Sequence, residues 1–260
     1  MNIVVLAKQV PDPEAFIEIV SGGKELEVEQ KFTANLFDEI ALEEALRIKE
    51  KHHGKVRIIT LGGEKATEVL RNGLAMGADE ALLLDDATLL CGDGYRTALV
   101  LSKAITKEPY DIVLCGRQAI DDDRGEVGAM VAQFLDLPHV GGIVKLDIAG
   151  NSAIAECATE GGREVIEVSL PAVFTAERGL NEPRTPLITG VMKAMRTPIA
   201  KMTADELGVA PESGGPSGSK TRIERYFPPK KRPEVRFIPG DAREAAAEAV
   251  GILMDVERVV

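Results

Sequence analysis

Short apolar runs alternate with segments of helical periodicity through the first half of the chain. The apolar runs have the length of buried strands and span residues 3–7, 56–63, 81–84 and 111–116. Apolar residues recur at helical intervals over residues 38–50, 64–76, 94–106 and 126–135. This alternation predicts an α/β fold with a doubly wound, mostly parallel sheet that helices cover on both faces.

The second half of the chain changes its period. Four segments are typical of β structure and are expected to join the sheet as antiparallel additions: residues 142–148, 152–159, 164–170 and 172–176. SGGK, at residues 21–24, is interpreted as a tight turn between two short extended segments.

A stretch rich in Gly, Pro and Ser predicts a domain boundary near residue 208. We therefore expect a nucleotide-binding domain over residues 1–207, followed by a linker and a C-terminal arm over residues 208–260. The arm should end in a helix over residues 241–256, with Asp241 as its N-cap. Such an arm either folds back on its own domain or covers a partner, and the pattern favours a partner.

Composition and charge exclude several classes of function. The chain has 260 residues and a formal net charge of −11, which disfavours nucleic acid as a partner. Its three cysteines, Cys91, Cys115 and Cys157, lack the paired spacing of a metal or disulfide site, so we expect reduced thiols in a cytoplasmic protein. No run is long enough for membrane insertion, and no nucleophile motif predicts catalytic residues.

The loop GRQAIDDDRGEVG, residues 116–128, is the strongest candidate for a ligand site. Ligands of parallel sheets bind beyond the carboxyl ends of the strands, which places the loops after Ala7, Leu61 and Cys115 on one edge. Gly125 and Gly128 would let helix N–H groups approach a phosphate. Of the three aspartates that follow Ile120, one is expected to cap the helix and another to accept a hydrogen bond from a ribose or from Arg117. A helix merely capped by acids is the alternative.

Several blocks together resemble a known family. AKQVPD, FTANLFDEIALEEALRIKE, RNGLAMGADEALLL, GRQAIDDDRGEVG and LNEPRTPLITGVMKA occur in the order found in beta subunits of electron-transfer flavoproteins. The resemblance covers roughly residues 1–207. Cys157 stands where the family usually has a lysine or arginine, which puts that single contact in doubt.

The resemblance implies a heterodimeric electron carrier rather than an enzyme with its own substrate. The alpha subunit would hold most of the FAD, and this chain would bury an AMP. Electrons would come from acyl-CoA or related dehydrogenases and leave to a membrane quinone oxidoreductase. By resemblance, the AMP-binding residues are Leu6, Asn35, Leu36, Phe37, Asp38, Leu61, Gly116, Arg117, Gln118, Ala119, Ile120, Asp121, Asp122, Asp123, Arg124, Gly125, Glu126 and Val127.

A second resemblance concerns the segment near residues 180–195. In the family this segment is the loop that docks on the dehydrogenase, which implies that Leu187 and Ile188 bind the partner, with Ile188 as the anchor. The two prolines before it predict a turn or a helix start at these residues. The alternative is that Leu187, Ile188, Val191 and Met192 simply cover the core.

Two other functions remain open. Some members of the family bind a second FAD in place of AMP and bifurcate electrons from NADH; they usually have glycine where this chain has Asp122. Many relatives have Asn-Gln-Thr where this chain has Gly125, Glu126 and Val127, so side-chain contacts to the phosphate are lost or replaced here. LNEPR, at residues 180–184, favours the AMP-holding group. The other alternative is a stand-alone ATP-binding protein of the universal-stress type, whose phosphate loop is not evident.

Overall fold

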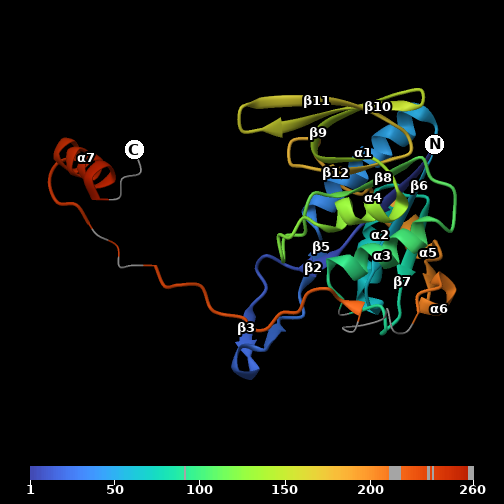
Figure 1. Ribbon diagram of the computed structural model, residues 1–260, viewed down its shortest axis with the longest axis horizontal. Coiled ribbons are helices and arrows are strands. Elements are labelled where there is room, and N and C mark those ends of the chain that lie inside the picture. The colour runs from blue at the N-terminus through green and yellow to red at the C-terminus, as the bar shows by residue number, and fades with distance from the viewer. Residues whose placement is uncertain (91, 211–217, 233–234, 236, 257–260) are drawn as a thin grey trace. The chain divides into compact units, whose positions relative to one another are not determined.

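The computed structural model describes residues 1–90, 92–210, 218–232, 235 and 237–256. The chain forms two compact units, Met1–Arg225 and Tyr226–Val260. Figure 1 labels most of their helices and strands. Cys91 and residues 211–217 of the predicted linker lie outside the described residues.

A nine-stranded sheet forms the centre of the first unit, in the order β11-β10-β9-β12-β8-β1-β6-β7-β13. Its strands are β1 (Asn2–Leu6), β6 (Lys55–Leu61), β7 (Glu80–Leu84), β8 (Ile112–Gly116), β9 (His139–Ala149), β10 (Ser152–Thr159), β11 (Gly162–Ser169), β12 (Ala172–Ala176) and β13 (Ala200–Met202). Neighbours pair in parallel from β9 to β13, whereas β10 pairs antiparallel with both β9 and β11. The predicted α/β fold with a mostly parallel sheet is confirmed.

The prediction for β12 is wrong. This strand does not extend the sheet as an antiparallel addition; it pairs in parallel with both β8 and β9. All five of its residues are buried. A strand covered on both faces has no alternation of apolar and polar residues, so the sequence AVFTA could not indicate its direction.

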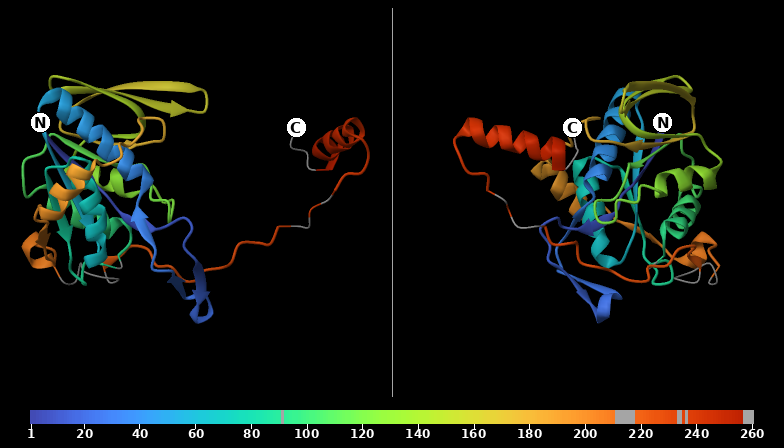
Figure 2. Two further views of the ribbon diagram at one scale, coloured as in Figure 1. Left: turned by 180° about the vertical axis from the view of Figure 1, so that it is seen from behind. Right: turned by 60° about the vertical axis from the view of Figure 1, so that its left-hand side comes forward.

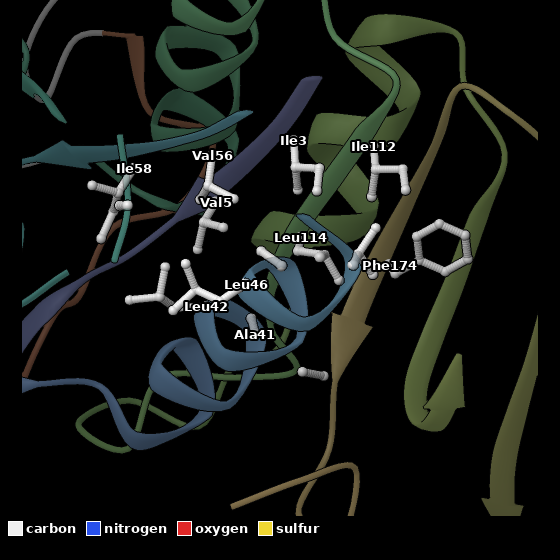
Figure 3. Packing of buried hydrophobic residues seen from close by; sticks show 14 of the residues in the cluster. Ile3, Val5, Ala41, Leu42, Leu46, Val56, Ile58, Ile112, Leu114 and Phe174 are labelled. Atoms are coloured by element: carbon white, nitrogen blue, oxygen red, sulfur yellow. The ribbon is translucent and has the colours of Figure 1, made fainter. Parts of the chain in front are cut away.

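Helices cover both faces of this sheet, as predicted. They are α1 (Leu36–His52), α2 (Thr67–Met76), α3 (Gly94–Ile105), α4 (Val127–Leu135), α5 (Ile188–Arg196) and the short α6 (Ala204–Leu207). Residues of α1, α2 and α5 pack in one hydrophobic cluster, and residues of α3, α4 and α6 pack in the other. The right-hand view of Figure 2 shows α1 and α4 on opposite sides of the sheet. In Figure 3, Leu42 and Leu46 of α1 face Val5 and Val56 of the strands.

The chain between β1 and α1 forms two small antiparallel sheets. β2 (Gln9–Pro11) pairs with β5 (Phe32–Ala34), and β3 (Ile17–Val20) pairs with β4 (Glu25–Val28). The turn that joins β3 to β4 is Ser21–Gly23, where Gly22 has a φ of 67°. The predicted tight turn at SGGK is confirmed.

The second unit contains the predicted terminal helix, α7 (Ala242–Gly251), followed by a π-helical turn, Ile252–Val256. Asp241 is its N-cap: the carboxylate oxygen Oδ1 accepts hydrogen bonds from the backbone N–H groups of Arg243 and Glu244, at 2.8 and 2.9 Å. Within the described part of the chain, α7 has no buried residue. Its apolar side chains are therefore available to another surface.

Candidate functional site

A cavity of about 800 Å³ opens at the carboxyl edge of the parallel strands. Leu6 at the end of β1, Leu61 at the end of β6 and Gly116 at the end of β8 line it, together with the N-terminal ends of α3 and α4. This is the edge that the strand order of an α/β sheet assigns to ligands. The volume lies within the range of about 300–1,000 Å³ that is usual for ligand pockets.

Most of the predicted AMP-binding residues line this cavity. They are Leu6, Asn35, Asp38, Leu61, Gly116, Arg117, Gln118, Ala119, Asp122, Arg124, Gly125, Glu126 and Val127. The other predicted residues, Leu36, Phe37, Ile120, Asp121 and Asp123, are not among the lining residues. The structure therefore brings together segments that lie far apart in the sequence.

Asp38 joins two strand ends beneath the cavity. One carboxylate oxygen accepts a hydrogen bond from the backbone N–H of Lys8, at 2.8 Å, and the other accepts from Gly116, at 2.7 Å. Burial raises the pKa of Asp38 to about 6, against the lowering effect of these hydrogen bonds. One buried side chain in the first turn of α1 thus holds the ends of β1 and β8 together.

Asn35 fixes the loop that follows β8. Its side chain is 1% exposed, and its amide nitrogen donates to the carbonyl of Gln118 at 2.9 Å. Its amide oxygen accepts from the backbone N–H of Ile120 at 3.2 Å. Because both halves of the amide are used, the loop is held at a defined distance from the start of α1.

The three aspartates mainly hold the loop itself. The ammonium group of Lys8 lies 2.8 Å from a carboxylate oxygen of Asp121 and 3.4 Å from one of Asp122. Asp123 has a φ of 51° and accepts a hydrogen bond from the side chain of Gln118 at 2.7 Å. The three carboxylates are thus directed to a lysine and to the side-chain amide of Gln118.

The expected helix cap is wrong: the N-cap of α4 is Glu126, and none of the described side chains caps this helix. The expected pairing of an aspartate with Arg117 is also wrong, because Arg117 pairs with Glu177. An aspartate that accepts from a ribose stays a prediction. The N–H groups at the start of α4 consequently lack a side-chain acceptor in the described residues, which suits them to an anion.

The two glycines of the loop have different roles. Gly125 has a φ of 62°, a left-handed conformation that glycine adopts without strain. Gly128 instead permits close packing, since a Cβ atom there would lie 2.4 Å from Thr175 Cγ2 and 3.0 Å from Cys115 Sγ. Gly128 thus seats α4 on the strands, a role that the sequence pattern did not indicate.

Sequence reasoning missed one wall of the cavity. Residues from the loop before α3, from its first turns and from a later segment also line it: Leu89, Leu90, Gly92, Asp93, Gly94, Thr97, Leu101, Ser219, Lys220, Thr221, Arg222 and Ile223. Asp93 directly before the predicted helix start was an available N-cap signal. Nothing in the local pattern of residues 219–223 indicates that they return to this edge.

Known proteins resemble this chain over nearly its whole length. The family model described as "Electron transfer flavoprotein domain" matches residues 26–207. An electron transfer flavoprotein subunit beta from Thermoanaerobacterium thermosaccharolyticum is 44% identical, with 96% of each chain covered. The corresponding subunit from Bacillus subtilis is 39% identical, with 100% of each chain covered. "Caffeyl-CoA reductase-Etf complex subunit CarD" from Acetobacterium woodii is 38% identical, with 98% of each chain covered.

The chain belongs to the electron transfer flavoprotein beta subunits. Membership supports a role in electron transfer and implies association with a flavin and with an alpha subunit in a heterodimer. Among the described residues there is no group of His, Cys, Asp and Glu side chains suited to a metal ion. None of the described helices is long and apolar enough to cross a membrane.

In this flavoprotein subunit the segment proposed to dock on a dehydrogenase is exposed. Leu187 is the N-cap of α5 and is 74% exposed; Ile188 begins the helix and is 81% exposed. The prediction of a helix start is confirmed, and the alternative that these two side chains cover the core is wrong. A Cβ atom on Gly190 would lie 2.4 Å from the carbonyl oxygen of Ala75, so α5 packs closely on α2.

Proposed function

We propose that this chain is the beta subunit of a heterodimeric cytoplasmic electron carrier that buries an AMP in the cavity described above. FAD, held mainly by the alpha subunit, would accept electrons from an acyl-CoA or related dehydrogenase and deliver them to a membrane quinone oxidoreductase. The observation that carries the proposal is the cavity at the ends of β1, β6 and β8, because most of the residues implied by the family resemblance line it.

The chemistry of the cavity fits an adenine nucleotide. Leu6, Leu61 and Leu101 supply apolar surface for a base. The start of α4 supplies N–H groups for a phosphate. Arg124 also lines the cavity, with its guanidinium group 3.5 Å from the carboxylate of Glu126. These residues bind and orient the nucleotide, and we assign no chemical step to them.

A second FAD in place of AMP is the second candidate. The cavity extends well beyond the residues assigned to AMP, to Leu89, Thr97 and residues 219–223, which leaves room for a dinucleotide. A subunit of a caffeyl-CoA reductase-Etf complex is also among the relatives. Such a protein would oxidise NADH and bifurcate its electrons. Family membership argues against the third candidate, a stand-alone ATP-binding protein of the universal-stress type.

A nucleotide count separates these candidates. The chain would be co-purified with its alpha subunit, the heterodimer denatured, and FAD and AMP quantified in the supernatant. We expect one FAD and one AMP per heterodimer. Two FAD without AMP would support bifurcation, and a nucleotide-bound homodimer with no affinity for an alpha subunit would contradict both.

Replacing Ile188 by alanine should slow reduction by the dehydrogenase. An exposed apolar anchor that fills a partner pocket contributes about 2 kcal/mol or more to binding. Because Ile188 is 81% exposed, the substitution should leave the melting temperature and the nucleotide content unchanged. Stopped-flow reduction by the cognate dehydrogenase provides the measurement.

Val165→Ala is the matched control for this prediction. Val165 is also an exposed aliphatic residue, 66% exposed, but lies on β11 at the far edge of the sheet. It should behave as the wild type. Equal rates for both variants and the wild type would refute the role of Ile188 as the anchor.

We further propose that the second unit covers the alpha subunit. Val250, Leu253, Met254 and Val256, in or directly after α7, are all exposed. An unpartnered apolar surface of this kind marks an interaction site more often than a free surface. In the proposed heterodimer, the alpha subunit would cover this apolar surface.

A further inference from the structure

Residues 219–223 form a segment along the cavity, which we call the strap. It belongs to the first unit and lines the cavity together with the loop after β8. The strap follows α6 in the chain and returns to the N-terminal end of α3. Its contacts there are made chiefly by one side chain, Asp93.

The two carboxylate oxygens of Asp93 have separate tasks. Oδ1 accepts from the backbone N–H of Arg96 at 3.1 Å and so caps α3. Oδ2 accepts from the backbone N–H groups of Lys220 and Thr221, at 2.7 and 2.8 Å, and from the Thr221 hydroxyl at 3.1 Å. The backbone N–H of Asp93 also donates to the hydroxyl of Ser219 at 3.1 Å. The hydrogen bonds between the helix start and the strap thus all involve this one residue in the described part of the chain.

Two further side chains of the strap carry a positive charge. The ammonium group of Lys220 lies 5.2 Å from the centre of the Tyr95 ring, a cation–π contact that holds the strap against α3. Arg222 lines the cavity, and no side chain in the described part of the chain pairs with its guanidinium group. A positive charge at the cavity that pairs with none of the described side chains is well placed for a phosphate.

We propose that the strap closes over the bound nucleotide, that Asp93 is the latch that holds it closed, and that Arg222 contributes a charge to the phosphate. This inference rests on the proposed function, since it takes an adenine nucleotide as the ligand. A nucleotide can leave only when the hydrogen bonds between Asp93 and the strap open. Asp93 is therefore a positioning residue that sets the rate of nucleotide release.

Asp93→Asn separates the latch from the helix cap. Asparagine caps helices about as well as aspartate, so its oxygen can still accept from Arg96. Its NH₂ group then faces three donors of the strap and cannot accept from them. The variant should lose the three hydrogen bonds that Oδ2 accepts from Lys220 and Thr221, while α3 stays capped.

Asp86→Asn is the matched control. Asp86 lies in the same loop region and likewise accepts from the backbone of a later segment, from Ala204 at 3.0 Å, and from Thr88. It does not line the cavity. A general loss of loop structure would affect both variants, whereas a latch at the cavity distinguishes them.

The experiment measures release of radiolabelled AMP from the intact heterodimer into excess unlabelled AMP. We expect release about tenfold faster or more from Asp93→Asn, and wild-type release from Asp86→Asn. Arg222→Gln should weaken AMP binding and reduce its dependence on salt. AMP should protect the strap from tryptic cleavage after Lys220 and Arg222 in the wild type, but much less in Asp93→Asn.

Equal release from the two aspartate variants, or equal tryptic protection, would overturn the latch. If the wild type retains FAD rather than AMP in this cavity, the same release measurement with FAD tests the strap. If the wild-type heterodimer binds AMP and Asp93→Asn releases AMP at the wild-type rate, the proposed function stands and the role of the strap is refuted. A heterodimer that holds no nucleotide in the beta subunit would refute both.

Discussion

Replacing Gly116 by alanine should destabilise the first unit severely and empty the cavity. Gly116 ends β8 and donates its backbone N–H to Asp38. A Cβ atom there would lie 2.5 Å from Phe37 Cβ, 2.6 Å from Asp38 Oδ1 and 2.8 Å from the backbone carbonyl carbon of Phe37. Backbone atoms cannot rotate away as the end of a flexible side chain can, so the first turn of α1 must shift.

The expected magnitude follows from the cost of overpacking a core. Forcing an additional methyl group into a closely packed site typically costs about 1–3 kcal/mol, and a clash with backbone belongs at the upper end. For a domain of this size that corresponds to a fall in melting temperature on the order of 10 °C. Thermal unfolding and the bound nucleotide would be measured on the same preparation.

Gly63→Ala provides the control. Gly63 follows β6, has a φ of −75° and would place its Cβ atom with nothing within 4 Å. Its melting temperature should match that of the wild type or rise slightly, because alanine restricts the unfolded chain more than glycine does. If Gly116→Ala proves equally stable, α1 and β8 do not approach as closely as the structure describes.

The sequence could predict the parts of the fold that local patterns encode. The buried strands β1, β6 and β8 are continuous apolar runs, and α1 and α3 carry helical periodicity, so their positions and the parallel sheet followed. For β12 the same property concealed the direction, since a strand buried on both faces has no polar side. Parallel pairing of β12 depends on contacts with β8 and β9, which no local pattern specifies.

Part of the cavity could likewise be predicted from the sequence, and part of it could not. The residues after β1, β6 and β8 could be assigned because strand ends of a parallel sheet converge on one edge. The strap could not, because its place depends on hydrogen bonds between Asp93 and residues more than a hundred positions later. The roles of the aspartates were also beyond the pattern, since the sequence could not indicate that Lys8 would reach Asp121.

Replacing Asp38 by asparagine should lower stability at every pH, by an amount that grows as the solution becomes more acidic. Asp38 accepts from both Lys8 and Gly116, and an amide has only one oxygen for these two donors. An unpaired buried donor costs about 1–3 kcal/mol. The strand ends at the floor of the cavity should loosen, and nucleotide affinity should fall with stability.

The pH dependence has a defined sign. Burial raises the pKa of Asp38 from its ordinary value of 3.8 to about 6, so the folded state takes up a proton that the unfolded state does not yet bind. Folding is therefore favoured progressively as pH falls from about 6 towards 4. The contribution approaches about 3 kcal/mol. Asparagine cannot titrate, so the gap between wild type and variant should widen by this amount.

Asp86→Asn supplies the contrast, because hydrogen bonds from Ala204 and Thr88 lower the pKa of Asp86 below 3.8. Stability from a lowered pKa is fully present well above 3.8 and is lost as pH falls, so the Asp86→Asn gap should stay constant from pH 7 to about 5 and then narrow rather than widen. Urea unfolding of the three proteins at several pH values between about 7 and 4 gives the comparison. If the stability difference between the wild type and Asp38→Asn does not widen as pH falls, Asp38 is still charged in the folded state at pH 4. Burial would then not govern its protonation.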